Sequence, residues 1–326
     1  MFERSLADNF MNFALADASR SLLPLAVICT AFFSQIAEQA GAETPRTISA
    51  GLVLERVAGP EAAVTPIGMA FDRRGRLFVV ESHTHKRPDD YDGPSGDRIR
   101  LFSDSDGDGK SDAWSTFAEG FAQAMNLMFR SDGALLVVTR RDVQALFDDD
   151  DDGAADRRET IVRLDTKAEY PHNGLSGIAR EPGSGRLMLG LGENFGAAYR
   201  LIGSDGSLVS DGGGAGAVFT CTPAGGDVER FAEGFWNPFS IVVQSDGAVM
   251  VVDNDPDASP PCRLLHVIRG GDYGHRYEYG RAGIHPLQAW DGELPGTLPM
   301  VCGTGEAPTA VVEHREIGRA SCRERV

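Results

Sequence analysis

The stretch "NLMFRSDGALLVVTRR", residues 126–141, consists of two apolar runs that flank a short polar turn ending in glycine. Short runs of apolar and β-branched residues bounded by such a turn are typical of β-strands. Asp-Gly is a preferred dipeptide of tight hairpin turns, because glycine takes backbone conformations that other residues avoid. The stretch therefore predicts a β-hairpin.

The same pattern occurs four times along the chain. Its turn glycines, Gly75, Gly133, Gly185 and Gly247, are 58, 52 and 62 residues apart. This spacing lies above the roughly 40–50 residues of common propeller repeats and leaves room for long loops. We predict an all-β fold of the β-propeller type, with a β-sandwich as the weaker alternative. The other copies read "GMAFDRRGRLFVVESH" (68–83), "GLSGIAREPGSGRLMLGLGEN" (174–194) and "PFSIVVQSDGAVMVVDND" (238–255).

Composition is compatible with this fold. The 326 residues are 42% hydrophobic, which is enough to bury a sizeable core. The 39 glycines and the low aromatic content of 8% suit a turn-rich β protein. A net charge of −17 argues against nucleic acid as a partner, because phosphate backbones attract basic surfaces.

The N-terminus has the pattern of an export signal. Arg20 precedes the apolar run "LLPLAVICTAFF" (22–33), and "AGA" at 40–42 offers small residues for cleavage. A run of this length is typical of a signal-peptide core and is short for a membrane span. We expect a periplasmic or secreted protein. An uncleaved leader that anchors the protein to a membrane is the alternative.

The C-terminal stretch "EIGRASCRERV" (316–326) back-translates into a string that resembles a sequencing adapter. The expected organisation is therefore a signal peptide over 1–42, an incomplete β-propeller domain over 43–315, and an artefactual tail over 316–326. The expected domain holds three cysteines, which allow at most one disulfide: Cys221, Cys262 and Cys302.

Two acidic segments share the spacing D-x-D-x-D-G-x-x-D and are offset by 44 residues: "DSDGDGKSD" (104–112) and "DDDDDGAAD" (148–156). Carboxylates at positions 1, 3 and 5 of such a loop converge on a calcium ion, position 9 often acts through water, and position 12 can be bidentate. The flanking residues are typical of strands, so hairpin loops are expected and EF-hand helices are not. Solvated turns that bind nothing are the alternative. The expected ligands are Asp104, Asp106, Asp108 and Asp112 in the first loop, and Asp148, Asp150, Asp152, Asp156 and Glu159 in the second.

Three further segments place polar residues at the ends of the third and fourth repeats, where propellers build sites at the mouth of the central channel. These segments are "EYPHNGLSGI" (169–178) with His172 and Asn173, "LGLGENFG" (189–196) with Glu193 and Asn194, and "EGFWNPFSI" (233–241) with Trp236 and Asn237.

The order of these loops, followed by "GGDYGH" (270–275), resembles the soluble quinoprotein glucose and sorbosone dehydrogenase superfamily. More closely, it is similar to dehydrogenase propellers of planctomycete-type bacteria, which also carry DxDGDG loops and are classed as membrane-bound. The resemblance covers roughly Val53 to Glu313. No single motif is strong, and their order and spacing carry the likeness.

The resemblance implies oxidation of a sugar or polyol C–OH group by hydride transfer to pyrroloquinoline quinone (PQQ). It implies a six-bladed propeller with calcium near the cofactor and a cytochrome-type electron acceptor, of which this chain would hold about four to five blades. His172 would be the general base, since histidine has an unperturbed pKa near 6.5. Glu193 would orient its imidazole, and Asn237 would hydrogen-bond the quinone or substrate. The expected cofactor-binding residues are Asn173, Asn194 and Trp236.

Two residues depart from the resembling enzymes. Glu193 replaces an aspartate, a change of one methylene. Trp236 replaces an arginine that would polarise the quinone oxygen, and a tryptophan cannot supply that charge. An aromatic ring at the channel mouth could instead stack on a sugar.

Each candidate also has a structural interpretation. His172 can be an ordinary loop residue, Glu193 can pair with an arginine, and the Trp-Asn-Pro turn can serve packing. Glu81, His83 and His85 are spaced for one face of a strand and could hold a metal. The alternative function is a non-catalytic propeller that binds carbohydrate or protein, with the aspartate loops as calcium staples.

Overall fold

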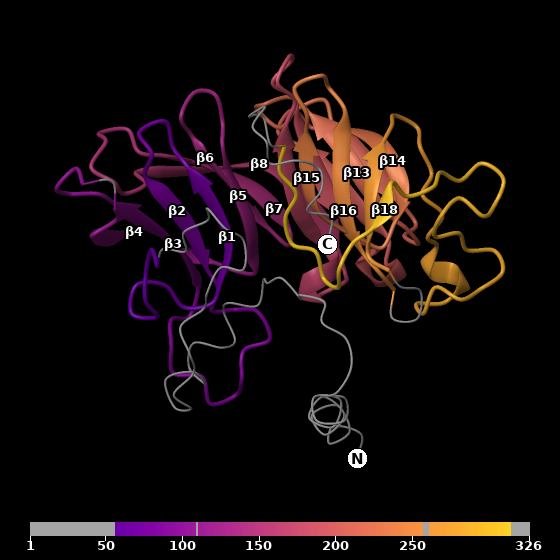
Figure 1. The fold of residues 1–326 in the computed structure, drawn as a ribbon, viewed down its shortest axis with the longest axis horizontal. Helices are drawn as coiled ribbons and strands as arrows, with labels where there is room; N and C mark the ends of the chain where they lie inside the picture. The colour runs from indigo at the N-terminus through magenta and orange to yellow at the C-terminus, as the bar shows by residue number, and fades with distance from the viewer. Residues whose placement is uncertain (1–55, 109, 257–260, 314–326) are drawn as a thin grey trace, which may run out of the picture. The chain divides into compact units, whose positions relative to one another are not determined.

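A computed structural model describes residues 56–108, 110–256 and 261–313 (Figure 1). The expected leader over 1–42 and tail over 316–326 lie outside the described residues, as does Gly109 of the first acidic loop. The described chain is all-β, with strands β1 to β18 and three single-turn 3-10 helices. None of these short helices has the length and apolarity needed to span a membrane.

Four antiparallel sheets follow one another along the chain, and the first and the fourth are each built from four consecutive strands. The first contains β1 (Pro66–Phe71), β2 (Leu77–Glu81), β3 (Asp97–Ser103) and β4 (Ala113–Phe121). The second contains β5 (Ala124–Phe129), β6 (Leu135–Thr139), β7 (Asp142–Phe147) and β8 (Arg157–Thr166). The third contains β9 (Leu175–Arg180), β10 (Leu187–Leu191), β13 (Gly216–Cys221) and β14 (Glu229–Phe235). The fourth contains β15 (Asn237–Val243), β16 (Val249–Asn254), β17 (Arg263–Val267) and β18 (Cys302–Gly303).

The first strand of each sheet packs against the first strand of the next: β1 against β5, β5 against β9, and β9 against β15. Consecutive four-stranded meanders that meet through their innermost strands are the blades of a β-propeller. One insertion departs from this regularity. The hairpin β11 (Tyr199–Gly203) and β12 (Leu208–Asp211) leaves the third blade and joins β8, so that the second sheet has six strands.

The four predicted hairpins are confirmed as β1–β2, β5–β6, β9–β10 and β15–β16. Their turn glycines all have positive φ, from 74° at Gly185 to 98° at Gly133. This left-handed conformation strains residues that carry a Cβ, which explains why the repeat places glycine there.

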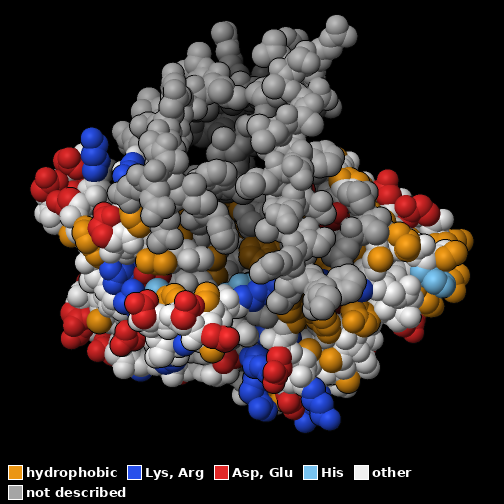
Figure 2. Space-filling view, turned by 90° about the horizontal axis from the view of Figure 1, so that it is seen from below, with side chains coloured by type: hydrophobic (Ala, Val, Ile, Leu, Met, Phe, Trp, Pro, Cys, Tyr) orange, Lys and Arg blue, Asp and Glu red, His pale blue; other side chains and the backbone are white. Residues whose placement is uncertain are grey.

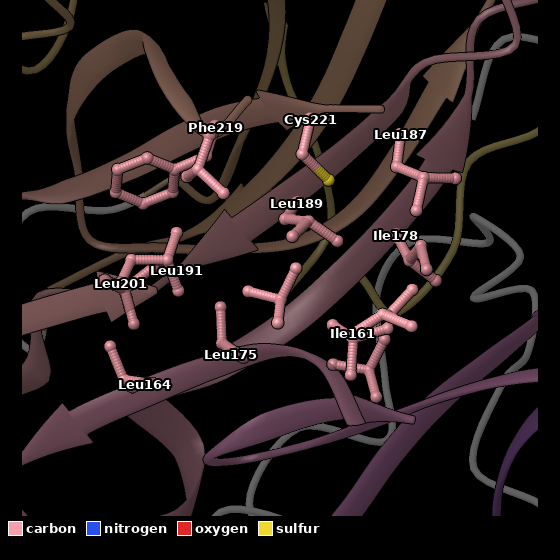
Figure 3. Close-up of a cluster of buried hydrophobic side chains, with 14 of the residues drawn as sticks. Ile161, Leu164, Leu175, Ile178, Leu187, Leu189, Leu191, Leu201, Phe219 and Cys221 are labelled. Carbon is pink, nitrogen blue, oxygen red and sulfur yellow. The ribbon is translucent and has the colours of Figure 1, made fainter. Parts of the chain in front are cut away.

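The largest apolar cluster lies between the second and third blades (Figure 3). Leu175, Leu189, Leu191 and Phe219 are fully buried within it. The second strands of these blades are apolar at consecutive positions because both of their faces are covered, as the burial of all five residues of β6 and of β10 indicates. Contact between adjacent blades therefore forms the core.

Antiparallel strands alternate in direction, so the loops of each blade fall on two opposite rims. The site rim holds the segments that precede first strands and follow second strands. The aspartate rim holds the hairpin turns and the loops between third and fourth strands. The site rim comprises residues 82–96, 122–123, 140–141, 167–174, 192–198, 236 and 255–256, together with the one or two strand residues that border them. The aspartate rim comprises residues 72–76, 104–108, 110–112, 130–134, 148–156, 181–186, 222–228 and 244–248.

Candidate active site

The structure places all six candidate catalytic and cofactor-binding residues on the site rim. His172 and Asn173 belong to the 3-10 helix η1 (Pro171–Asn173), immediately before β9. Glu193 and Asn194 follow β10, and Glu193 caps the 3-10 helix η2 (Asn194–Gly196). The backbone N–H of Glu193 donates to the carbonyl of Trp236 over 2.8 Å, which ties these loops together.

The imidazole of His172 contacts a second histidine. Its Nε2 lies 2.9 Å from Nε2 of His85, and the two rings meet edge to face with centroids 4.3 Å apart. Burial, the neighbouring His85 and the charge of Lys86 lower the pKa of His172 to about 4. The pKa of His172 thus lies below the unperturbed value of about 6.5, because the ring is removed from water beside a cation. Histidine side chains are visible on the lower face of the molecule (Figure 2).

Glu193 does not orient His172. Its carboxylate accepts hydrogen bonds from the side chain of Asn173 and from the backbone N–H of Phe195, and the side chain is fully buried. Burial raises the pKa of Glu193 to about 7, although both hydrogen bonds and the guanidinium groups of Arg281 and Arg140 oppose the shift. The expected pair of His172 with Glu193 is thus replaced by two pairs, His172 with His85 and Glu193 with Asn173.

Asn194 contributes to the structure of the rim. Its amide oxygen accepts from Nη2 of Arg140 at 3.2 Å, and its Nδ2 donates to Thr166 and Ala197. Asn173 directs its amide group to Glu193. The prediction that Asn194 contacts a cofactor is not supported by these contacts, because they occupy its amide oxygen and nitrogen.

Trp236 is packed beneath the rim. Only 5% of it is exposed, its ring meets His275 edge to face at 5.1 Å, and the guanidinium of Arg281 lies 5.2 Å from the ring centroid. A ring covered in this way cannot stack on a sugar in this conformation. Asn237, the next residue, is held by the buried carboxylate of Asp253, which accepts its backbone N–H at 2.7 Å.

Several buried polar atoms on the site rim have no hydrogen-bonding partner among the described residues. They lie at the starts of first strands or at the ends of second strands. Buried polar atoms are normally paired, so a cluster of exceptions marks a place where a polar ligand or water fits. These atoms are Ser82 Oγ, Arg140 Nη1, Ser176 Oγ, Asn237 Oδ1 and Asn254 Oδ1.

The proposed metal trio does not form. Glu81 is bound by Arg98, at 2.8 and 3.1 Å, while His83 contacts Tyr91 through Nδ1 and lies 3.5 Å from Glu81 through Nε2. His85 lies apart, against His172. Strand β2 ends at Glu81, so the alternation that would have placed the three side chains on one face stops there.

The first acidic loop joins β3 to β4 on the aspartate rim. Carboxylate oxygens of Asp104, Asp106 and Asp108 lie within 4.8 Å of one another, as the spacing predicted. The fourth expected ligand is directed elsewhere, because the carboxylate of Asp112 accepts from the backbone and side chain of Ser105 at 2.8 and 2.7 Å.

The second acidic loop joins β7 to β8 and gathers a different set, because Asp156 at position 9 takes the place of the expected Asp152 beside Asp148 and Asp150. Asp152 accepts from the backbone N–H of Ala154 at 2.8 Å. The expectation for Glu159 is wrong, because this residue lies in strand β8 and pairs with Arg157 at 2.6 Å. An extended strand rises about 3.3 Å per residue and carries position 12 away from the loop.

The three cysteines of the described chain are free thiols, with Cys221 and Cys262 buried and Cys302 exposed. The thiol of Cys262 donates to the carboxylate of Asp255. Burial raises the pKa of Cys221 to about 12, which leaves it unreactive at neutral pH.

Sequence reasoning missed Arg140, the partnership of His85, and Arg281. Arg140 is fully buried and wedged between blades, with Nε donating to the carbonyl of Tyr170 at 2.6 Å. The repeat contained a usable signal, because Arg140 follows its turn glycine by 7 residues and Glu193 follows its own by 8. Aligned positions after the second strand therefore share the rim.

The chain belongs to a family described as a domain of unknown function (DUF7133), whose model matches residues 43–256. No curated protein sequence matches it.

Solved structures with similar folds include several sugar dehydrogenases by title. The PQQ-bound form of aldose sugar dehydrogenase from Streptomyces coelicolor is 15% identical, with a TM-score of 0.51 over 78% of this chain and 71% of that chain. A glucose dehydrogenase is 18% identical, with a TM-score of 0.48 over 72% and 70%. A carbohydrate-active enzyme of family AA12 from Trichoderma reesei is 18% identical, with a TM-score of 0.48 over 74% and 64%. At these identities the similarity concerns the fold alone, and it agrees with the predicted β-propeller type.

Proposed function

We propose that this protein is a quinoprotein-type dehydrogenase that oxidises a C–OH group of a sugar or polyol. The observation that carries the proposal is the site rim itself. An unprotonated histidine, a buried carboxylate with a raised pKa and several unpartnered polar atoms gather there. Titratable groups whose pKa values are shifted in opposite directions are typical of sites for proton transfer.

His172 is the proton acceptor in this proposal. A pKa of about 4 keeps its imidazole unprotonated at neutral pH, as a base must be. An anionic ligand beside the ring would raise that pKa towards the working pH, because opposite charges favour the protonated form. Glu193 supports the site indirectly, since it holds Asn173, the residue next to His172.

The residues present fit an anionic quinone such as PQQ, which carries carboxylates. Arg140 is fully buried and forms no ion pair with a carboxylate of the described chain, and its Nη1 has no partner. Arg140 and Asn237 would hold the cofactor by hydrogen bonds. Arg281 lies over Trp236 and can supply the positive charge that the tryptophan lacks. When bound, the quinone supplies the two-electron acceptor for the substrate hydride.

Export through the leader, calcium binding by the acidic loops and a cytochrome-type electron acceptor remain predictions from the sequence. The second candidate function is a non-catalytic propeller that binds carbohydrate or protein. The two clusters of three carboxylates favour it, because calcium staples serve stability without catalysis.

Reconstitution of the purified full chain with PQQ and calcium tests the proposal. We expect a change in the quinone absorbance on binding, followed by reduction of an artificial dye when aldoses or polyols are added. The proposed dehydrogenase would be rejected if the quinone absorbance did not change and no member of the panel reduced the dye. Stabilisation by calcium without turnover would favour the non-catalytic propeller.

A further inference from the structure

Two histidines from blades separated by one other blade meet on the site rim. His85 lies in the segment between β2 and β3 of the first blade, and His172 lies in η1, before the first strand of the third blade. Their Nε2 atoms are 2.9 Å apart, and the ring planes are inclined by 84°. The distance is that of a hydrogen bond between two ring nitrogens.

The pair shares one proton. A neutral imidazole has one N–H donor and one bare nitrogen acceptor, so a hydrogen bond between two Nε2 atoms needs one ring of each tautomer at the contact. Burial is the main cause that lowers the pKa of His85 and of His172. Lys86 lowers both pKa values further, while Asp97 opposes the shift at His85. Both rings are therefore neutral at pH 7.

The two arrangements of that proton have different consequences. If His85 donates, Nε2 of His172 is occupied as an acceptor and its Nδ1 carries the hydrogen, so neither nitrogen can accept a substrate proton. If His172 donates from Nε2, its Nδ1 is bare and able to accept. Only the second arrangement is compatible with a base at His172.

We propose that His85 is a positioning residue that accepts a hydrogen bond from Nε2–H of His172 and so makes Nδ1 of His172 the nitrogen that receives the substrate proton. This inference rests on the proposed function. His85 takes the place that a carboxylate commonly has beside a catalytic imidazole, because it fixes the tautomer and the ring orientation. After proton transfer, the charged Nε2–H of His172 donates a stronger hydrogen bond to the same partner.

The segment around His85 is fastened to the first blade. The carboxylate of Asp97 accepts from the backbone N–H groups of His83 and Thr84 at 2.6 and 2.7 Å, and from the Thr84 hydroxyl at 2.8 Å. Arg87 donates to the carbonyl of His83 at 3.2 Å. A positioning residue must be held rigidly by its neighbours, because a mobile hydrogen-bonding partner cannot select one tautomer.

The other groups near the pair do not compete for its shared proton. Tyr170 packs against His172 with ring centroids 5.1 Å apart, and the ammonium of Lys86 lies 5.0 Å from the Tyr170 ring centroid. Lys86 acts as a fixed positive charge, and Asp97 is engaged by Thr84. His85 is thus the hydrogen-bonding partner that the structure gives to the His172 ring.

Nitrogen-15 NMR of the labelled full chain reads the tautomer directly and requires no turnover. At pH 7 we expect long-range proton–nitrogen correlations to show a protonated Nε2 and a bare Nδ1 in His172. His85→Leu should lose this preference, and turnover after reconstitution with PQQ should fall by roughly 10²–10⁴-fold, the range of general-base contributions. His85→Gln offers a carbonyl oxygen as acceptor and should restore both the tautomer and most of the turnover.

His266→Gln is the matched control, because it makes the same substitution at an exposed position of β17. It should change neither the tautomer of His172 nor turnover. A bare Nε2 in wild-type His172 would overturn the inference even if PQQ supports turnover, and so would full turnover in His85→Leu. The expected tautomer in a protein that never reduces the dye would uphold the pair and reject only the proposed function.

Discussion

The two rims of the propeller differ in how far their charged side chains are exposed to water. On the aspartate rim, Asp104, Asp106 and Asp108 are exposed, and their carboxylates accept from backbone N–H groups of their own loop. On the site rim, Arg140 and Glu193 are fully buried, and burial shifts their pKa values to about 10 and about 7. Charged side chains are thus exposed to water on one rim, whereas on the other they are buried and their pKa values are displaced.

The difference teaches where each rim can act. Exposed carboxylates that converge can bind a hard cation, since such cations take oxygen ligands. Buried groups with displaced pKa values can exchange protons near neutral pH. Burial of such groups is unfavourable, and the surrounding contacts must offset that free energy. The conspicuous acidic motif therefore marks a candidate staple, and the less conspicuous rim carries the candidate chemistry.

The largest effect is expected from His172→Ala. Turnover of the reconstituted protein should fall by roughly 10²–10⁴-fold, because the variant lacks the proposed base. Asp106→Asn on the aspartate rim should leave the turnover number unchanged. Dye reduction by the two variants measures the contrast, and comparable losses in both would show that the rims do not divide chemistry from stability in this way.

Removal of a buried charge comes next. Asp253 and Arg263 pair at 3.0 Å with both side chains fully buried. Arg263→Met should lower the free energy of unfolding by about 3–5 kcal/mol, because it leaves a buried carboxylate unpaired. Arg74→Met breaks the exposed pair with Asp151 on the aspartate rim and should cost far less, because water screens exposed ion pairs. Urea unfolding measures both, and equal costs would contradict the contrast.

Acid should act through His275, a buried residue whose ring packs against Trp236 of the site rim. Burial lowers the pKa of His275 to about 3, below its ordinary value of 6.5. Below pH 6.5 the unfolded chain therefore binds a proton on His275, whereas the native protein does not. The contribution of neutral His275 to the free energy of unfolding is complete above pH 6.5 and is lost as the pH falls towards 3. Between pH 6.5 and 4.5, His275→Gln should lose less unfolding free energy than the wild type, by on the order of 2 kcal/mol.

Glu193 has the opposite sign, since its raised pKa of about 7 makes stability fall as the pH rises from 4.5 to 7. This term is present in both the wild type and His275→Gln, and their difference isolates His275. His285→Gln, at an exposed histidine, is the control. Parallel pH profiles of wild type and His275→Gln would exclude the assigned role.

Calcium should give the smallest effect. For an affinity on the order of 10⁻⁴–10⁻³ M, calcium at ten times the dissociation constant stabilises the folded state by about 1.4 kcal/mol. We expect a higher melting temperature in calcium than in chelator. The rise should be reduced in Asp106→Asn and in Asp150→Asn, and kept in His172→Ala. An unchanged melting temperature in the wild type would show that the acidic loops are solvated turns.

The sequence by itself determined the features that depend on neighbouring residues. The repeated turn glycines predicted the four hairpins, because a positive φ at Gly75 or Gly133 is a local requirement of the turn. The alternate carboxylates at positions 1, 3 and 5 of the first acidic loop converge as expected from their spacing. In the second loop positions 1 and 3 converge with position 9, Asp156, in place of position 5. The prediction of a calcium ligand at position 12 was wrong for Glu159, because this residue lies in strand β8 and not in the loop.

Only the tertiary structure decided the environment of each candidate residue. The spacing of 87 residues between His85 and His172 contains no sign of their contact, which arises when loops of different blades meet at the rim. The raised pKa of Glu193 likewise depends on burial beneath neighbouring loops. Local sequence specifies backbone conformation, whereas burial and long-range contacts set protonation, and these exist only once the blades have packed.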